Sequence, residues 1–334
     1  MATQINPALA RLWLANNIRQ YGYRSPEQIS VANEAAARAL DYLEQGISAT
    51  QLESLSSIAR LQEREVASLL ERLGGLLTNH TGFQPELTAA EVSDHFSELA
   101  RIFLQSRDDP AEVLAKRLSS IVFLESVGKT GLTVAKGLAA SRIGRLITMD
   151  QKRIAKTDCH SLGFEAGQIG QPRAQAAQRQ LGKTKIELHS RITNTLARVD
   201  LAVLIATDIV EPASYQPWLT REVPHISVVF DEEGVEVSPL IIPGVTPCLS
   251  CIELHRLDTI PDWNLIAPQL ANLERSLDDA AMLLFASSIV VNQTLNLVDI
   301  GATDAAGLAH RLNRKGELKS YLLESKQCGC RSVL

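Results

Sequence analysis

Residues 119–150 read SSIVFLESVGKTGLTVAKGLAASRIGRLITMD, and the fold class of the chain is predicted from this segment. The apolar run Ile121–Leu124 predicts a buried strand, and a glycine-containing turn at 126–131 follows it before an amphipathic helix. A second apolar strand, Leu146–Met149, comes next. This β-α-β order predicts an α/β fold with a Rossmann-like nucleotide-binding domain. Asp150 stands where such folds place the carboxylate that binds ribose hydroxyls.

The turn matches G-x-G-x-x-G with one substitution, because Ser126 replaces the first glycine while Gly128 and Gly131 keep the second and third. The first glycine serves the tight turn, and the second lets the backbone approach a phosphate. Residues 119–191 carry twelve Lys or Arg and five Asp or Glu, a net charge of +7 (12 − 5), in a chain of net charge −5. This favours an anionic ligand, although a β-α-β unit that only supports a sheet remains an alternative.

The whole chain has 334 residues, of which 45% are hydrophobic and 21% charged, enough for two domains with a large core. Its longest apolar patch, Ala280–Val291, is interrupted by Ser287 and Ser288 and suits a buried helix better than a membrane span. The N-terminus lacks a basic start followed by an apolar core. We therefore expect a cytoplasmic protein with no membrane partner.

Residues 1–75 predict a separate winged-helix-like domain. Helical patterns cover Glu34–Leu43, Ala49–Ile58 and Arg64–Leu73, and Leu12–Tyr23 has the composition of one or two short strands. Residues 76–118 are expected to form a linker and a helix, the helix lying within Ala89–Leu104.

Charge in this N-terminal domain argues against nucleic acid, since residues 1–75 hold seven Arg, no Lys and eight Asp or Glu. The other common use of such a module is recognition of an extended peptide on a strand edge, for which Arg19, Tyr21 and Arg24 are the candidate contacts. The alternative is that the domain only packs on the α/β core.

Asp208 is a further candidate site residue. It follows the apolar run Leu201–Ala206, and the carboxyl end of a buried parallel strand faces the ligand crevice of an open α/β sheet. Capping of the next helix is the alternative role.

Four of the five cysteines form two close pairs, Cys248-x-x-Cys251 and Cys328-x-Cys330. Two such thiolate pairs complete a closed tetrahedral zinc site, which is structural because it holds no open coordination position. A thioredoxin-like redox C-x-x-C is the alternative, but it leaves the second pair unexplained. Cys159 stands alone and is expected to be a small buried or half-buried residue.

A family resemblance follows from the order of these motifs. SVGKTG, LITMD, GQPR (170–173), ATD (206–208), PGVTPCLSC (243–251) and the final CGC together resemble the ThiF/MoeB superfamily of ubiquitin-activating-like adenylyltransferases. IIPGVTPCLSCIELHR and PDWNLIAPQL resemble one branch more closely, the leader-peptide-binding partner proteins of thiazole/oxazole-modified microcin (TOMM) biosynthesis. In that branch an N-terminal winged-helix peptide-recognition domain precedes a ThiF-like domain, here 119–334.

The resemblance implies a nucleotide site with several departures from the superfamily pattern. Its matching positions are Ser126, Gly128, Gly131, Asp150, Arg173 and Asp208, of which Asp208 and Arg173 are the candidate catalytic residues. Arg173 replaces the usual lysine, Lys152 a second aspartate and Asp158 an asparagine, and the usual loop arginine is missing near Ser161. Since preorganised positive groups stabilise the charge that develops on the α-phosphate, these changes predict weak adenylation or none.

Two functions remain open at this stage. In the first, a zinc-stabilised ThiF-like protein with a degraded adenylation site binds a leader or carrier peptide and presents it to a partner enzyme such as a YcaO-type cyclodehydratase. In the second, an active ATP-dependent adenylyltransferase activates the C-terminus of a small carrier protein or peptide. ThiF-like relatives also imply a homodimer, through a face of the apolar helix 277–298 that carries Ala281, Leu284, Ser288, Val291 and Leu295.

Overall fold

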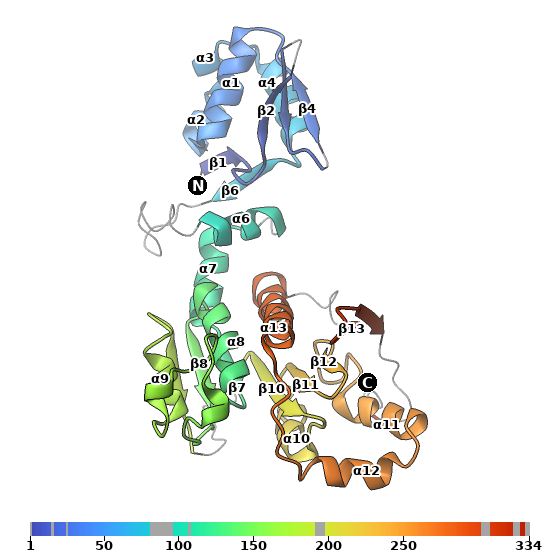
Figure 1. Cartoon of the computed structure of the whole chain (residues 1–334). Helices are drawn as coiled ribbons and strands as arrows, with labels where there is room; N and C mark the ends of the chain where they lie inside the picture. Colours follow the sequence, from blue (N-terminus) through green and yellow to red (C-terminus); the bar gives the residue numbers. More distant parts are fainter. Residues whose placement is uncertain are drawn as a thin grey trace. The chain divides into compact units, whose positions relative to one another are not determined.

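The chain divides into two compact units, Met1–Ala115 and Lys116–Leu334 (Figure 1). The computed structural model describes residues 2–14, 17–24, 26–80, 96–105, 108–190, 198–301, 308–322 and 328–330. The boundary between the units falls inside the segment 76–118 that the sequence sets apart. Each unit is described by itself.

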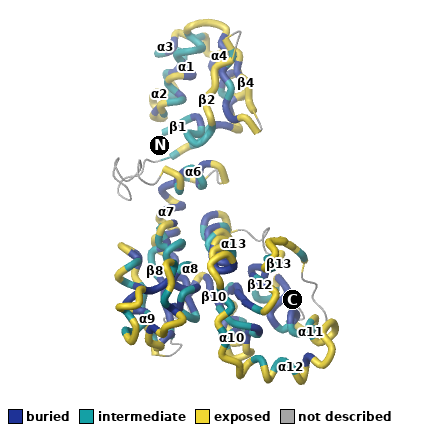
Figure 2. The backbone as a smooth tube through the Cα atoms, viewed as in Figure 1, coloured by how far each residue is buried: buried dark blue, intermediate teal, exposed yellow. Residues whose placement is uncertain are grey.

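The N-terminal unit contains two small antiparallel sheets. In the first, β1 (Ala2–Ile5) lies between β5 (Ile47–Ser48) and β6 (Leu77–His80). The second is a meander of β2 (Arg11–Leu14), β3 (Ile18–Tyr21) and β4 (Glu27–Ser30), so the region 12–23 contains two short strands, as expected. All four residues of the edge strand β2 are exposed (Figure 2).

Helices α1 to α4 pack with these sheets. Asn33 caps α1 (Glu34–Gln45) by accepting a hydrogen bond from the Ala36 N–H, and α4 spans Glu63–Leu73. The sequence predicts one helix at 49–58, but two short helices form, α2 (Ala49–Glu53) and α3 (Leu55–Ala59). They are separate because Ser54 leaves helical geometry and its hydroxyl donates to the Thr50 carbonyl at 2.8 Å.

Apolar side chains of the sheets and of α1 to α4 meet in one core, which includes Ile5, Tyr21, Leu40, Leu43, Leu55 and Leu69. The helix expected within 89–104 is described only from Phe96, as α6 (Phe96–Gln105), and its start lies outside the described residues. Leu99, Ile102 and Phe103 of α6 pack on Val113 and Leu114 of α7 (Pro110–Ser119).

The C-terminal unit is built on an eight-stranded sheet in the order β14-β13-β12-β11-β10-β7-β8-β9. The parallel strands are β7 (Ile121–Leu124), β8 (Arg145–Thr148), β9 (Lys185–Leu188), β10 (Leu201–Thr207) and β11 (His225–Phe230). Three antiparallel strands extend it, β12 (Gly234–Val237), β13 (Leu308–Asn313) and β14 (Leu318–Leu322). The predicted Rossmann-like α/β fold is confirmed.

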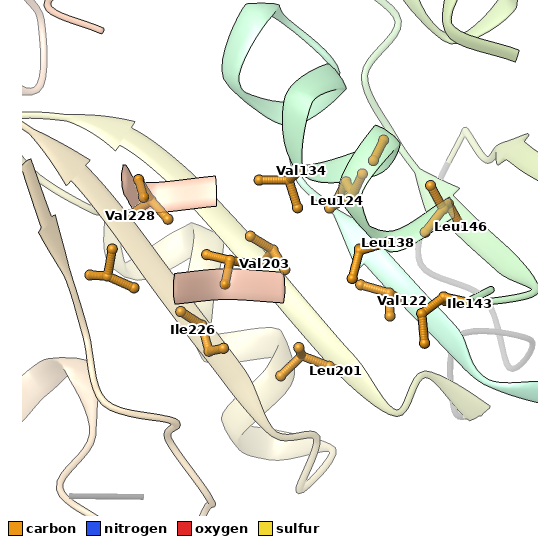
Figure 3. Packing of buried hydrophobic residues seen from close by; sticks show 14 of the residues in the cluster. Val122, Leu124, Val134, Leu138, Ile143, Leu146, Leu201, Val203, Ile226 and Val228 are labelled. Atoms are coloured by element: carbon orange, nitrogen blue, oxygen red, sulfur yellow. The ribbon is translucent and has the colours of Figure 1, made fainter. Parts of the chain in front are cut away.

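Helices cover both faces of this sheet. They are α8 (Lys129–Ala140), α9 (Arg173–Gln178), α10 (Pro212–Thr220), α11 (Leu249–Thr259), α12 (Trp263–Leu270) and α13 (Ala280–Ile300). Val134 and Leu138 of α8 pack against Val122, Leu124 and Val203 of the central strands, as Figure 3 shows. On the other face, Phe123 contacts Trp218 of α10 with ring centroids 4.5 Å apart.

Helix α13 is long and apolar enough to span a membrane by length and composition alone, and 44% of its most apolar window is buried inside the protein. Its buried residues include Leu295, whereas Ala281, Leu284 and Ser288 of the predicted dimer face are exposed. Near its end, Asp299 accepts two hydrogen bonds from the fully buried Arg117, at 2.8 and 2.6 Å.

Candidate functional site

The order of the parallel strands fixes the position of the candidate site. From β9 the neighbours are β8, β7, β10 and β11, so the chain order reverses between β7 and β10. In open α/β sheets ligands bind at the carboxyl ends of the two strands that flank such a reversal. A cavity of about 220 Å³ lies there, and its lining includes Lys129, Lys152, Arg173 and Arg275.

The glycine-containing turn forms one wall of this cavity. A Cβ atom on Gly131 would lie 1.8 Å from the Ser126 carbonyl oxygen, so only glycine fits there. Gly128 is the N-cap residue of α8, and its N–H donates to the Ser126 hydroxyl at 3.2 Å. The Ser126 hydroxyl therefore accepts from an N–H group at the helix N-terminus. Such N–H groups otherwise bind anions.

Asp150 and Arg173 come together as the sequence predicts, but they bind each other. The Asp150 carboxylate accepts hydrogen bonds from the Val127 N–H at 2.9 Å and from Arg173 at 3.2 Å. Arg173 also binds Asp158, through Nη2 at 2.8 Å and Nε at 3.0 Å. Burial lowers the pKa of Arg173, but hydrogen bonds and charge from Asp158 and Asp150 outweigh burial and raise it. The cation is held between two carboxylates.

Asp208 follows β10 in a left-handed conformation, with φ at 68°. Its carboxylate accepts a hydrogen bond from Arg275 Nε at 3.0 Å and forms an ion pair with the same guanidinium. The helix-capping alternative is wrong, because α10 begins after Glu211 and Asp208 bonds to Arg275 instead. Sequence analysis missed Arg275, which lies 67 residues further along the chain with no motif around it.

Glu125 is a second functional candidate that sequence analysis missed. It follows β7, donates its N–H to the Val203 carbonyl at 3.0 Å, and accepts from the Ile205 N–H at 3.0 Å, so it joins β7 to β10 at the reversal. Burial raises the pKa of this carboxyl, opposed by hydrogen bonds from Ser214 and Ile205. The rule that selects Asp208, a carboxylate at the end of a buried strand, would also have found it.

The three candidate peptide contacts have different surroundings. Arg19 and Tyr21 are buried, at 3% and 1% exposure, and both bind Glu44 of α1, at 3.0 and 2.7 Å. Arg19 also pairs with Asp41 at 2.8 Å. Only Arg24 is exposed, beside the ring of Tyr23. Arg19 and Tyr21 therefore stabilise the N-terminal unit in this structure, and the apolar side chains of β2 face solvent.

The two cysteine pairs converge at the start of α11. The sulfur atoms of Cys248, Cys251, Cys328 and Cys330 all lie within 4.8 Å of one another. Cys248 and Cys328 are 3.3 Å apart, and Cys251 and Cys330 are 3.6 Å apart. Zinc bonds of ~2.3 Å in a tetrahedron place sulfurs ~3.8 Å apart, so this donor set fits a closed zinc site. Cys159 lies elsewhere, with its thiol near the Ala155 and Glu165 carbonyls.

No protein-family model matches the chain, and no curated protein matches its sequence. Solved structures do resemble it. E. coli MccB superposes with a TM-score of 0.70 and 14% identity over 99% of this chain and 97% of MccB. A structure of the microcin C7 biosynthetic enzyme MccB in complex with N-formylated MccA gives 0.69 and 14% over 99% of this chain and 100% of that one.

The structure of PaaA covers less of the chain, with a TM-score of 0.61 and 17% identity over 78% of this chain and 92% of PaaA. Since each of these identities is low, the likeness concerns the fold. The chain therefore has the fold of MccB along almost its whole length, and this is the ThiF/MoeB-like fold that its motifs predict.

Proposed function

We propose that this chain is a zinc-containing, ThiF-like protein that binds a leader or carrier peptide through its N-terminal unit and presents it to a partner modifying enzyme. Its adenylation site is degraded. The exposed edge strand β2 is the observation on which the peptide-binding part rests. MccB, which has the same fold over nearly its full length, has been solved in complex with MccA.

The hydrogen-bond pattern of the meander supports β2 as the docking edge. Gly22 donates to the Ala10 carbonyl at 2.8 Å, and Val31 donates to the Asn17 carbonyl at 2.7 Å. Since bonded and non-bonded pairs alternate along antiparallel strands, Leu12 and Leu14 bond to β3, and the N–H and C=O of Trp13 point away from it. Such an open edge accepts an added peptide strand through main-chain hydrogen bonds.

Side chains favour this edge over the opposite one. Leu12, Trp13 and Leu14 are 37%, 67% and 41% exposed, so the edge offers apolar contacts as well as backbone groups. On the other edge, β4 is mainly polar, and its Gln28 carbonyl already accepts a hydrogen bond from Arg72 at 3.1 Å.

The cavity at the carboxyl ends of β7 and β10 is named the nucleotide crevice below. The ion pairs in it support the proposal that the adenylation site is degraded. Arg173 is bound to two carboxylates and Asp208 to Arg275, so a nucleotide must break both arrangements before these groups can act on it. The cavity of about 220 Å³ is smaller than the ~300 to 1,000 Å³ of ordinary ligand pockets. Loss of one preorganised charge contact typically raises a barrier by ~3 to 4 kcal/mol.

A proline at the open edge tests peptide binding. Trp13→Pro removes the N–H that faces the edge but no β2–β3 hydrogen bond, and proline is tolerated on edge strands. Trp13→Phe is the matched control, because it keeps the N–H and an aromatic ring. The probe is the labelled leader of a precursor peptide encoded beside the gene, measured by fluorescence polarisation. Equal affinity for both variants would refute docking on β2.

An active adenylyltransferase is the second candidate function. It is favoured by the four cations in the lining of the crevice and by the structure of MccB with ATP. ATP-pyrophosphate exchange with the leader peptide separates the two functions. Background exchange supports the binding protein, whereas turnover of ~1 per second, within the usual range of enzymes, establishes the enzyme.

A further inference from the structure

We propose that a second cavity of the C-terminal unit binds a ligand that combines an apolar body with a positively charged end group, as in an ammonium- or guanidinium-bearing side chain of a peptide. The cavity has a volume of about 640 Å³, within the range of small-molecule sites. The charge selectivity follows from its lining, and the assignment of the ligand to a peptide rests on the proposed function.

The cavity adjoins the nucleotide crevice. Arg275 contributes to the lining of both, and its ion-pair partner Asp208 faces the larger cavity. A ligand bound here would therefore lie next to the cavity between β7 and β10. Its lining includes Asp208 and Asp231, so the ligand would lie near the carboxyl ends of β10 and β11.

One wall of the cavity is charged and already well ordered. Glu236 of β12 binds Arg311 at 3.3 Å, lies 3.7 Å from Arg256, and accepts a hydrogen bond from the Tyr321 hydroxyl. Arg311 also binds Asp231 at 2.7 Å and Glu233 at 3.0 Å. These contacts hold the carboxylates in fixed positions, so a ligand meets the net charge of the wall.

The charges in the lining do not cancel. Five carboxylates, of Asp208, Asp231, Glu232, Glu233 and Glu236, face three guanidinium groups, of Arg256, Arg275 and Arg311. The formal excess is two negative charges (5 − 3) when His255 is neutral. A phosphate or carboxylate is disfavoured in such a cavity, and a cation is attracted.

The apolar part of the lining comes from α11 and α12. It includes Ile252, Trp263, Ile266 and Leu270. The indole of Trp263 is held by a hydrogen bond from its N–H to Glu253 at 3.0 Å, and Arg256 lies 5.4 Å from its ring centroid. An aliphatic or aromatic body would pack on this wall while its charged end reaches the carboxylates, as long basic side chains do.

Two small probes with one body test the charge selectivity. The full-length protein is titrated with 4-phenylbutylamine and with 4-phenylbutanoate, and binding is measured by saturation-transfer NMR and calorimetry. We expect the amine to bind at least fivefold more tightly. Equal binding of the two probes, or binding of neither, would overturn the proposal.

A charge-reversal variant tests whether the amine binds in this cavity. Glu232 is exposed, and the ion pairs of the charged wall run through its neighbours Asp231 and Glu233, so Glu232→Lys leaves them intact. It should weaken amine binding about fivefold, from the loss of one attraction and the gain of one repulsion. Glu71→Lys, on an exposed position of α4, is the control and should change nothing. Unchanged binding by Glu232→Lys would refute this site.

These titrations use neither the leader peptide nor a nucleotide. Amine binding without leader binding would therefore support the cavity and overturn the proposed function. Leader binding without amine binding would overturn the cavity alone.

Discussion

Replacing Cys330 with serine should release the metal that we propose for the cysteine cluster. The four sulfurs lie within 4.8 Å of one another, close to the ~3.8 Å edge of a tetrahedral zinc–thiolate site. Structural zinc sites contribute ~10 to 16 kcal/mol in isolated peptides. An equal share for each of four ligands is ~2.5 to 4 kcal/mol, so losing one ligand should weaken zinc binding by roughly two to three orders of magnitude.

Cys159→Ser is the matched control, since Cys159 lies outside the cluster. Elemental analysis should find one zinc per chain in the wild type and in this control. After dialysis against a chelating dye, the Cys330→Ser variant should retain almost none. Hydrogen exchange should also rise at the start of α11, where Cys248 and Cys251 are anchored. Wild-type protein with no zinc and four reactive thiols would refute the metal site, as would equal zinc retention by both variants.

Three further predictions concern stability and assembly. Asp299→Ala should lower the free energy of unfolding by ~3 to 5 kcal/mol, because it removes the carboxylate that pairs with the buried guanidinium of Arg117. Denaturant titration measures this loss, and adding Arg117→Met should recover part of it. Burial lowers the pKa of His225 from 6.5 to about 4, although a hydrogen bond to the Val223 backbone raises it in part. The folded state therefore disfavours the protonated imidazole. The free energy of unfolding should fall by up to ~3 kcal/mol as the pH is lowered from above 6.5 to 4. Denaturant titrations at both pH values measure this loss, and His225→Leu should remove it. Leu284→Arg, on the exposed face of α13, should convert a homodimer into monomers in light scattering, and a wild-type monomer at micromolar concentration would contradict the dimer.

The parts of the fold that the sequence predicts best are those encoded by neighbouring residues. The strand at 121–124 has the predicted bounds, and the second strand shifts by one residue to Arg145–Thr148. Both are short, mainly apolar runs, and Gly144 directly precedes the second one. The cysteine cluster was also predictable, because two close cysteine pairs indicate a metal site even when ~80 residues separate them in the sequence.

The direction of side chains on the hairpin was not predictable from the sequence. Alternation places Arg19 and Tyr21 on one face, but it does not say which face is buried. An arginine is expected to face solvent unless it is paired. Here the partners, Asp41 and Glu44, come from α1, and only the folded unit brings them to Arg19.

Ion pairing also affects the residues that the sequence assigns to a nucleotide site. In the folded protein these residues already have partners of opposite charge, so they are not free to bind a nucleotide. Arg173 and Asp158 are close in sequence, whereas Asp208 and Arg275 are 67 residues apart. A ligand that needs the charge of Arg173 or Asp208 must compete with a partner that is already in place. If each exchange costs ~1 kcal/mol, two of them lower the apparent affinity roughly thirtyfold. A protein that binds a peptide elsewhere does not bear this cost, and it keeps the ion pairs of Arg173 and of Asp208 at the carboxyl end of its parallel strands.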